Sequence, residues 1–207
     1  EALEQYALIK RNVSPQIKRE LVDSLISTFN YTEAFQIWSD AAGPVAQVYD
    51  GGFEGQIKFG ETGFGWHVVR QPQIEVSQDA AEKESGGKSL RIMFTGDSPP
   101  TLASIAQTIV VKPDQRYRVS WAVQSKEIVT GGSPLLSLED PRSRARIVSA
   151  NLQLESGIWH KQSVEFSAPP GCHAVLLKVA RNECSTAPCP IFGTLWLDSF
   201  GIEEIGH

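Results

Sequence analysis

Residues 117–124 read YRVSWAVQ, and in this stretch aromatic or β-branched residues alternate with polar or small ones. This period of two predicts a β-strand with one side in the core and the other facing outward. The same alternation predicts strands at residues 90–94, 105–111, 164–166, 175–179 and 194–202. Gly86-Gly87 and Pro169-Pro170-Gly171 supply turns between them. We therefore predict a mainly β fold, an antiparallel β-sandwich of about eight to ten strands.

The first 43 residues follow a helical period instead. One apolar stripe comprises Ile17, Leu21, Val22, Leu25, Ile26 and Phe29. Ser14 followed by Pro15 is a preferred helix start, and Gly43-Pro44 is a preferred helix end. We expect an N-terminal α-helical hairpin within residues 1–43, joined to a β-domain at residues 44–207.

The composition excludes several classes of protein. The chain has 207 residues, of which 41% are hydrophobic and 21% are charged, so it is not a disordered chain. Its net charge of −5 argues against a nucleic-acid partner, because proteins that bind the phosphate backbone are usually basic. The best apolar run, at residues 104–111, is too short for a membrane span, so no membrane helix is expected.

The chain begins at Glu1, without a methionine and without a basic stretch followed by an apolar run. No secretory signal peptide is therefore visible in it. We interpret the sequence as a piece of a longer protein. We expect that protein to lie in the periplasm or another extracytoplasmic space of a bacterium.

Two of the three cysteines flank a short loop. Cys184 and Cys189 enclose Ser-Thr-Ala-Pro, a stretch rich in turn formers directly before the last predicted strand. A disulfide across this loop is sterically possible and suits an oxidising compartment. The alternative is two unrelated thiols. Cys172 is left over and is expected to be a small strand residue.

The helical segment contains an internal repeat. Residues 34–41, AFQIWSDA, have the spacing of residues 2–9, ALEQYALI, which lie 32 positions earlier. This segment resembles the last one and a half repeats of a tetratricopeptide array, although Val22 and Leu25 replace the usual glycine and tyrosine. The resemblance implies an array that continues upstream and gathers protein partners, since such repeats bury their apolar faces by stacking. The alternative is a generic helical hairpin that packs on the next domain.

A second resemblance covers about three-quarters of the chain. Its landmarks, in order, are Asp50-Gly51-Gly52-Phe53-Glu54, Phe64-Gly65-Trp66, Gly87-Lys88-Ser89-Leu90-Arg91, Gln107-x-Ile109-x-Val111-x-Pro113, Tyr117-Arg118-Val119-Ser120, Trp159, Val164-x-Phe166-x-x-Pro169 and Trp196-Leu197-Asp198-Ser199-Phe200. The set resembles the jelly-roll carbohydrate-binding modules appended to xylanases and glucanases, which have the galactose-binding-like architecture. The resemblance implies an eight-stranded jelly roll without catalytic activity.

Sequence motifs for catalysis are mostly absent. Residues 131–135, GGSPL, lack the closing glycine of a nucleophile elbow. Residues 86–89, GGKS, imitate the end of a phosphate-binding loop, but Glu82 replaces its first glycine and a strand follows. The four histidines have no zinc-ligand spacing. We therefore expect no enzymatic activity.

Long polar side chains on the strands are the candidate ligand-binding residues. Those predicted on the non-core face are Arg91, Arg118, Gln124, Lys178 and Arg181. Such donors bind hydroxyl groups, and arginine binds uronate carboxylates in a bidentate manner. The alternative is a solvated face that keeps the sandwich soluble. Three further arginines at residues 142–146 form a local cationic patch in a loop.

Aromatic rings stack on sugar rings, so the five tryptophans are also of interest. Alternation places Trp121 in the core, and Trp66 is expected there as well. Trp159 and Trp196 could be partly exposed. Trp38 belongs to the helical segment and is expected to pack against a helix or the sandwich.

The resemblance to carbohydrate-binding modules also implies a structural calcium ion at Glu54 and Asp198. The first and last strands of a sandwich commonly pair, which would bring these two carboxylates together. They would then repel each other unless a cation or an arginine lay between them. Backbone carbonyl groups such as those of Gly52 and Lys88 could complete the oxygen shell. The alternative is that both carboxylates accept hydrogen bonds and bind no metal.

Together these patterns predict a non-catalytic polysaccharide-binding module on a repeat-protein scaffold at the bacterial envelope. The alternative function is an assembly scaffold whose sandwich binds proteins and has no affinity for sugars. An exposed aromatic or donor-lined groove on one sheet would separate the two.

Overall fold

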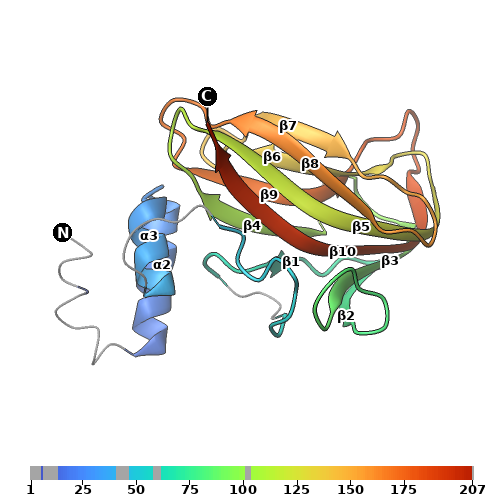
Figure 1. The fold of residues 1–207 in the computed structure, drawn as a ribbon, viewed down its shortest axis with the longest axis horizontal. Helices are drawn as coiled ribbons and strands as arrows, with labels where there is room; N and C mark the ends of the chain where they lie inside the picture. Colours follow the sequence, from blue (N-terminus) through green and yellow to red (C-terminus); the bar gives the residue numbers. More distant parts are fainter. Residues whose placement is uncertain (1–5, 7–13, 41–46, 58–61, 101–103, 207) are drawn as a thin grey trace.

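The computed structural model describes residues 6, 14–40, 47–57, 62–100 and 104–206 (Figure 1). The helices in the described part of the chain are α2 (Pro15–Ser27) and α3 (Tyr31–Ser39). The strands in the described part of the chain are β1 (His67–Val68), β2 (Ile74–Asp79), β3 (Ser89–Asp97), β4 (Ile105–Val110), β5 (Arg116–Thr130), β6 (Pro134–Glu139), β7 (Arg146–Asn151), β8 (His160–Ser167), β9 (Ala174–Arg181) and β10 (Pro190–Ile205).

The strands form two antiparallel sheets that pack face to face. Sheet A has the strand order β1-β4-β9-β6-β7, and sheet B has the order β2-β3-β10-β5-β8. The last strand, β10, lies inside sheet B and pairs with both β3 and β5. The prediction of a mainly β antiparallel sandwich with two N-terminal helices is confirmed (Figure 1).

The core between the sheets consists of the residues that the alternation selects. Trp121 from β5, Leu177 from β9 and Leu195 from β10 are all buried in one hydrophobic cluster. Trp66 belongs to the same cluster, so its predicted core position is confirmed. Each such side chain contributes roughly 1.5–3 kcal/mol when it leaves water. Because one face of each long strand is buried in this core, only the side chains of the opposite face can contact a ligand.

The helical hairpin begins where the sequence predicts. The Ser14 hydroxyl accepts a hydrogen bond from the backbone N–H of Ile17 at 3.3 Å, and Pro15 fills the first turn of α2. The expected repeat at residues 2–9 lies outside the described residues, apart from Tyr6.

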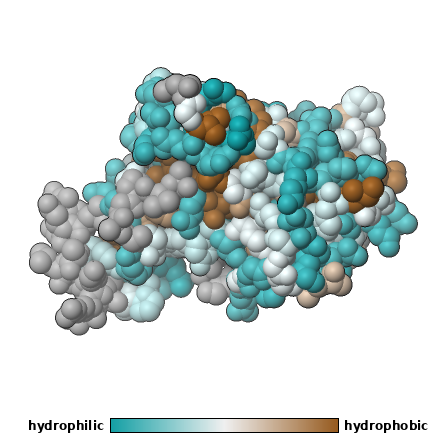
Figure 2. Space-filling model, viewed as in Figure 1, coloured by the Kyte–Doolittle hydropathy of each residue, from teal (hydrophilic) through white to brown (hydrophobic). Residues whose placement is uncertain are grey.

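The predicted apolar stripe of α2 is only partly covered. Val22 and Leu25 are buried in a second hydrophobic cluster, whereas Ile17 and Phe29 are exposed. No helix in the described part of the chain is long and apolar enough to span a membrane. On the face shown in Figure 2, hydrophilic residues cover most of the described surface and hydrophobic residues gather in smaller patches.

The second hydrophobic cluster joins the helices to the sandwich. It includes Phe64, which precedes β1, together with Val110 of β4 and Ala174 of β9. Val110 and Ala174 pair across these strands, and α3 contacts β4. The helices therefore pack beside one end of sheet A, as Figure 1 shows near the tip of β4.

Candidate functional site

The five predicted ligand-binding residues do not share one face of the sandwich. Arg91, Arg118 and Gln124 lie on strands β3 and β5 of sheet B, whereas Lys178 and Arg181 lie on β9 of sheet A. The prediction of one donor-lined face is therefore wrong. The alternation within each strand was read correctly for most of them, but it carries no information about which strands share a sheet.

Arg118 lies between carboxylates of both neighbouring strands. The register places it opposite Glu165 on β8 and Glu203 on β10. Its guanidinium donates to these carboxylates at 2.7 and 2.8 Å. The hydrogen bond from Arg118 lowers the pKa of the Glu165 carboxyl, and the same bond raises the pKa of Arg118. The chain itself therefore already supplies Arg118 with the carboxylate partners that a uronate would offer.

Arg91 and Gln124 flank Trp196 in one row across sheet B. Arg91 donates to a glutamate of β2 at 3.1 Å, and Gln124 donates to Glu82 at 3.1 Å. The Trp196 indole donates to Asp79 at 3.0 Å, and this bond is the main cause that lowers the pKa of Asp79. Trp196 is buried, so the outer face of sheet B presents a row of internally paired polar groups.

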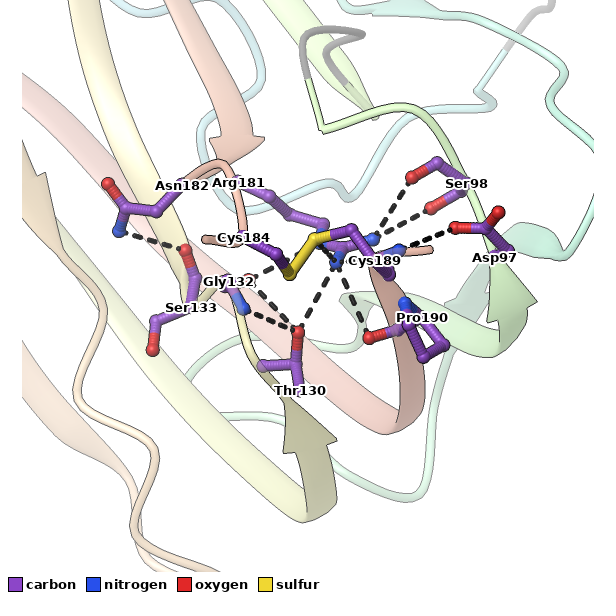
Figure 3. The surroundings of a disulfide bond; sticks show 10 residues. All are labelled: Asp97, Ser98, Thr130, Gly132, Ser133, Arg181, Asn182, Cys184, Cys189 and Pro190. Carbon is purple, nitrogen blue, oxygen red and sulfur yellow. Dashed lines mark hydrogen bonds between the residues drawn. A yellow bond between two sulfur atoms is a disulfide. The ribbon is translucent and has the colours of Figure 1, made fainter. Parts of the chain in front are cut away.

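Arg181 lies inside the protein rather than on an outer face (Figure 3). Its side chain is only 7% exposed, because it follows Val179 in the inward-facing positions of β9. The guanidinium donates to the backbone carbonyls of Ser98, Gly132 and Cys189 at 3.2, 3.3 and 2.7 Å. Burial lowers the pKa of the Arg181 guanidinium. The predicted outward position of Arg181 is therefore wrong, and its donors are used within the fold.

A disulfide between Cys184 and Cys189 lies against this guanidinium (Figure 3). The two Cα atoms are 5.5 Å apart. The N–H of Cys189 also donates to the Asp97 carboxylate at 3.2 Å. The structure thus joins the two cysteines that the sequence favoured, while Cys172 is buried as a free thiol.

Lys178 lies on the outer face of sheet A. The register aligns it in one row with Ala106 of β4, Ser137 of β6 and Ser149 of β7. Its ammonium forms an ion pair with Glu139 of β6 at 2.6 Å. The two side chains are only 19% and 15% exposed, so the pair is recessed in the sheet.

The recessed ion pair places hydrogen-bond donors beside acceptors. An ammonium has three donors and a carboxylate has about four acceptor positions, so both retain capacity after pairing with each other. We define the sheet A face as the polar outward residues Thr108, Ser137, Glu139, Ser149, Asn151 and Lys178. Leu135, Leu176 and Ala180 share their rows, and Ser137 is itself buried. The paired charges of this face cancel, which suits hydroxyl groups better than an anion.

The residues predicted for calcium come together, although 144 positions separate Glu54 from Asp198. The carbonyl of Gly51 accepts the N–H of Phe200 at 2.9 Å, which holds the two chain segments side by side. A Cβ atom added to Gly52 would lie 3.8 Å from Asp198 Oδ1 and 3.7 Å from Glu54 Cγ. The side chains of Glu54 and Asp198 therefore both approach this glycine.

Backbone N–H groups surround both carboxylates. Asp198 is fully buried, and its Oδ2 accepts the N–H groups of Glu84 and Ser85 at 2.9 and 3.0 Å. Glu54 Oε1 accepts those of Gly87 and Lys88 at 2.7 and 3.3 Å. Among the described residues, no three His, Cys, Asp or Glu side chains gather in a group suited to a metal ion.

A cavity of about 620 Å³ lies between α3 and the segment that precedes β1. The described residues that line it are Trp38, Gln47, Tyr49, Asp50, Gly55, Gln56, Thr62 and Gly65. Trp38 packs on Phe64, as the sequence led us to expect, with 5.8 Å between the ring centroids. No local pattern predicts that Trp38 and Tyr49 meet, because the two residues lie in different segments of the chain.

Solved structures of other proteins share this fold, although a search of curated proteins found no match. Among solved structures, a CBM4 module is 12% identical with a TM-score of 0.56, covering 76% of this chain and 99% of that one. The CBM22-1 xylan-binding domain of Xyn10C from Paenibacillus barcinonensis is 18% identical with a TM-score of 0.51, covering 81% of this chain and 99% of that one. These identities show a shared fold only.

The family comparison is more specific. Residues 45–186 match the family model described as a carbohydrate binding domain. This match spans more than half of the chain and covers all of sheet A and every strand of sheet B except β10. The chain therefore belongs to the carbohydrate binding domain family, as a non-catalytic carbohydrate-binding module.

Proposed function

We propose that this module binds a neutral, hydroxyl-rich polysaccharide on the sheet A face. The observation that carries the proposal is the recessed Lys178–Glu139 pair, which offers donors and acceptors without net charge. The arginines that would favour an acidic polysaccharide are engaged elsewhere, since Arg118 is paired on sheet B and Arg181 is buried. Xylan, named for one structure of the same fold, is the first probe to test.

Replacing Lys178 with methionine is expected to reduce retention in xylan-containing affinity gels by about tenfold. The change removes three donors and leaves the Glu139 carboxylate without its partner, so a loss of ~1.4 kcal/mol in binding is reasonable. Affinity electrophoresis at several xylan concentrations measures the change.

Lys161→Met makes the same substitution on the other sheet and serves as the control for this experiment. Lys161 also forms an ion pair, with Glu84 at 2.8 Å, but it lies on β8 of sheet B. Its variant should be retained like the wild type. Equal retention of Lys178→Met and the wild type, with unchanged melting of both, would remove the sheet A face as the binding site.

We propose that Glu54 and Asp198 hold a structural calcium ion. Each carboxylate has about four acceptor positions and accepts two or three N–H bonds here, so lone pairs remain for a cation. Carbonyl groups of Gly52 and Lys88 are near enough in the chain to add oxygen ligands. The ion would supply positive charge between two carboxylates. It would stabilise the fold and take no part in chemistry.

We also propose that α2 and α3 end a tetratricopeptide-like array that binds a protein partner, on a scaffold at the bacterial envelope. The exposed Ile17 and Phe29 support a further packing surface, and the disulfide supports an oxidising compartment. Cell fractionation with non-reducing mass spectrometry tests the location. Cross-linking in intact cells from a photoreactive residue at position 17 tests the partner. A cytoplasmic protein with free thiols, or the absence of any cross-link, would contradict the respective proposal.

A further inference from the structure

We infer that the cavity between α3 and the sandwich is a second saccharide subsite, which takes a neutral pyranose ring of the bound polysaccharide. We call it the Trp38–Tyr49 pocket and define it by the lining residues given above. The inference rests on the proposed function, namely that the module binds a neutral polysaccharide. It adds that the helical segment contributes directly to the binding surface.

The pocket is large enough for a sugar unit, and its lining suits one. Its volume of about 620 Å³ falls within the range of roughly 300–1,000 Å³ that is usual for small-molecule sites. Gln47 and Gln56 bring amide groups that can both donate and accept, and Thr62 brings a hydroxyl. This combination of apolar walls with a few polar groups matches a ring that has C–H faces and hydroxyl edges.

The apolar wall is formed by two aromatic rings. Trp38 and Tyr49 meet edge to face, with 4.8 Å between the ring centroids and an interplanar angle of 80°. Tyr49 remains 46% exposed in spite of its apolar body. When a pyranose C–H face packs against a partly exposed aromatic ring, apolar surface leaves water and binding is favoured.

The Trp38 indole and the main chain of Tyr49 are held in place before any ligand binds. Gly63 has a φ of +98°, and a Cβ atom there would lie 2.6 Å from Cδ1 and Nε1 of Trp38, so backbone lies directly against the indole. The main chain of Tyr49 is fixed by Gln107, a fully buried residue of β4. Gln107 accepts the Tyr49 N–H at 2.8 Å and donates to its carbonyl at 2.9 Å. Such preorganisation lowers the entropy cost of binding.

The charge of the lining selects the class of sugar. Asp50 is the only charged residue among the described lining residues. Its carboxylate accepts the N–H groups of Glu54 and Gly55 at 2.8 and 3.1 Å, which keeps it in place as an acceptor. A uronate would be repelled by this negative charge, whereas a neutral hydroxyl can donate to it.

A smaller cavity shares lining residues with the Trp38–Tyr49 pocket. It has a volume of about 190 Å³, and Trp38 and Thr62 line both cavities. Lys18 lies in the smaller cavity but is paired with Asp40 at 2.6 Å. Arg19 also lines the smaller cavity, so its lining is basic, unlike that of the Trp38–Tyr49 pocket.

The test compares two aromatic residues of similar exposure. Tyr49→Ala removes a ring from the pocket, and Phe192→Ala removes a ring that is 48% exposed on β10 of sheet B. The full chain is titrated with xylohexaose and with cellohexaose by calorimetry. Tyr49→Ala should weaken binding about threefold to tenfold, and Phe192→Ala should leave it unchanged. The Trp38 indole N–H resonance, assigned with Trp38→Phe, should shift on titration.

Each outcome distinguishes the two proposals. Binding by Tyr49→Ala equal to that of the wild type, or a Trp38 resonance that does not move while the wild type binds, overturns the pocket and leaves the sheet A face standing. Loss in Tyr49→Ala but not in Lys178→Met supports the pocket and overturns the sheet A face. Tighter binding of an oligogalacturonate overturns the neutral class. A wild type that no polysaccharide retains overturns both.

Discussion

Replacing Arg181 with methionine is expected to lower the free energy of unfolding by about 3–5 kcal/mol. Methionine keeps much of the apolar stem but removes the donors that serve the carbonyls of Ser98, Gly132 and Cys189. A buried acceptor left without a partner costs roughly 1–3 kcal/mol. The carbonyls of Ser98 and Cys189 both lose the guanidinium, whereas that of Gly132 keeps the Thr130 hydroxyl at 3.1 Å. Urea denaturation followed by fluorescence measures the change.

Arg118→Met provides the control for this prediction. It makes the same substitution at an exposed arginine whose partners, Glu165 and Glu203, remain in contact with water. Its denaturation midpoint should stay close to that of the wild type, because exposed ion pairs contribute little. If Arg181→Met and Arg118→Met unfold at the same denaturant concentration, the buried guanidinium is not a structural centre of the sandwich.

Calcium is expected to raise the melting temperature of the wild type by about 5–10 °C. A ligand that binds only the folded state at a hundred times its Kd adds about 2.7 kcal/mol, and each kcal/mol is worth about 2–4 °C in a chain of this size. Asp198→Asn should abolish this shift. It should also destabilise the protein by about 2–3 kcal/mol in chelator, because an amide in place of the buried carboxylate leaves N–H groups such as those of Glu84 or Ser85 without their charged acceptor.

The Glu54→Gln variant separates the contribution of the calcium ion to stability from that of the hydrogen bonds. Glu54 is exposed, so its variant should melt near the wild type in chelator and yet lose the response to calcium. Differential scanning calorimetry with excess calcium and with chelator gives all three comparisons. Identical curves for the wild type under both conditions would show that the carboxylates are satisfied by backbone N–H groups alone.

Much of the fold follows from the sequence because burial obeys a simple period. Trp121 and Leu177 lie in the core since every second residue of a strand faces the opposite sheet. The start of α2 was equally predictable, because Ser14 and Pro15 satisfy local requirements of the first helical turn. The meeting of Glu54 and Asp198 came from the resemblance to known modules and not from any local pattern.

Other features could not be read from a local pattern. Arg181 continues the inward series of β9, but its charge argued for the outer face. Its burial is compensated by hydrogen bonds to carbonyl and hydroxyl groups of other segments, which no local pattern reveals. Lys178 and Arg118 were predicted to share a face, but they lie on different sheets. Which strands share a sheet depends on contacts between distant segments, so alternation within each strand could not reveal it. The Trp38–Tyr49 pocket depends on the two hydrogen bonds between the Gln107 side chain and the main chain of Tyr49, which lies 58 positions away in the sequence.

The second hydrophobic cluster has a consequence for how the molecule unfolds. Val110 and Ala174 belong to the helical cluster, while their chain neighbours Ile109 and Val175 belong to the sandwich core. Loss of β4 or β9 therefore removes the support of the helices at the same moment. The described helices and the sandwich should behave as one cooperative unit, so that a single calorimetric transition, with equal calorimetric and van't Hoff enthalpies, accounts for both.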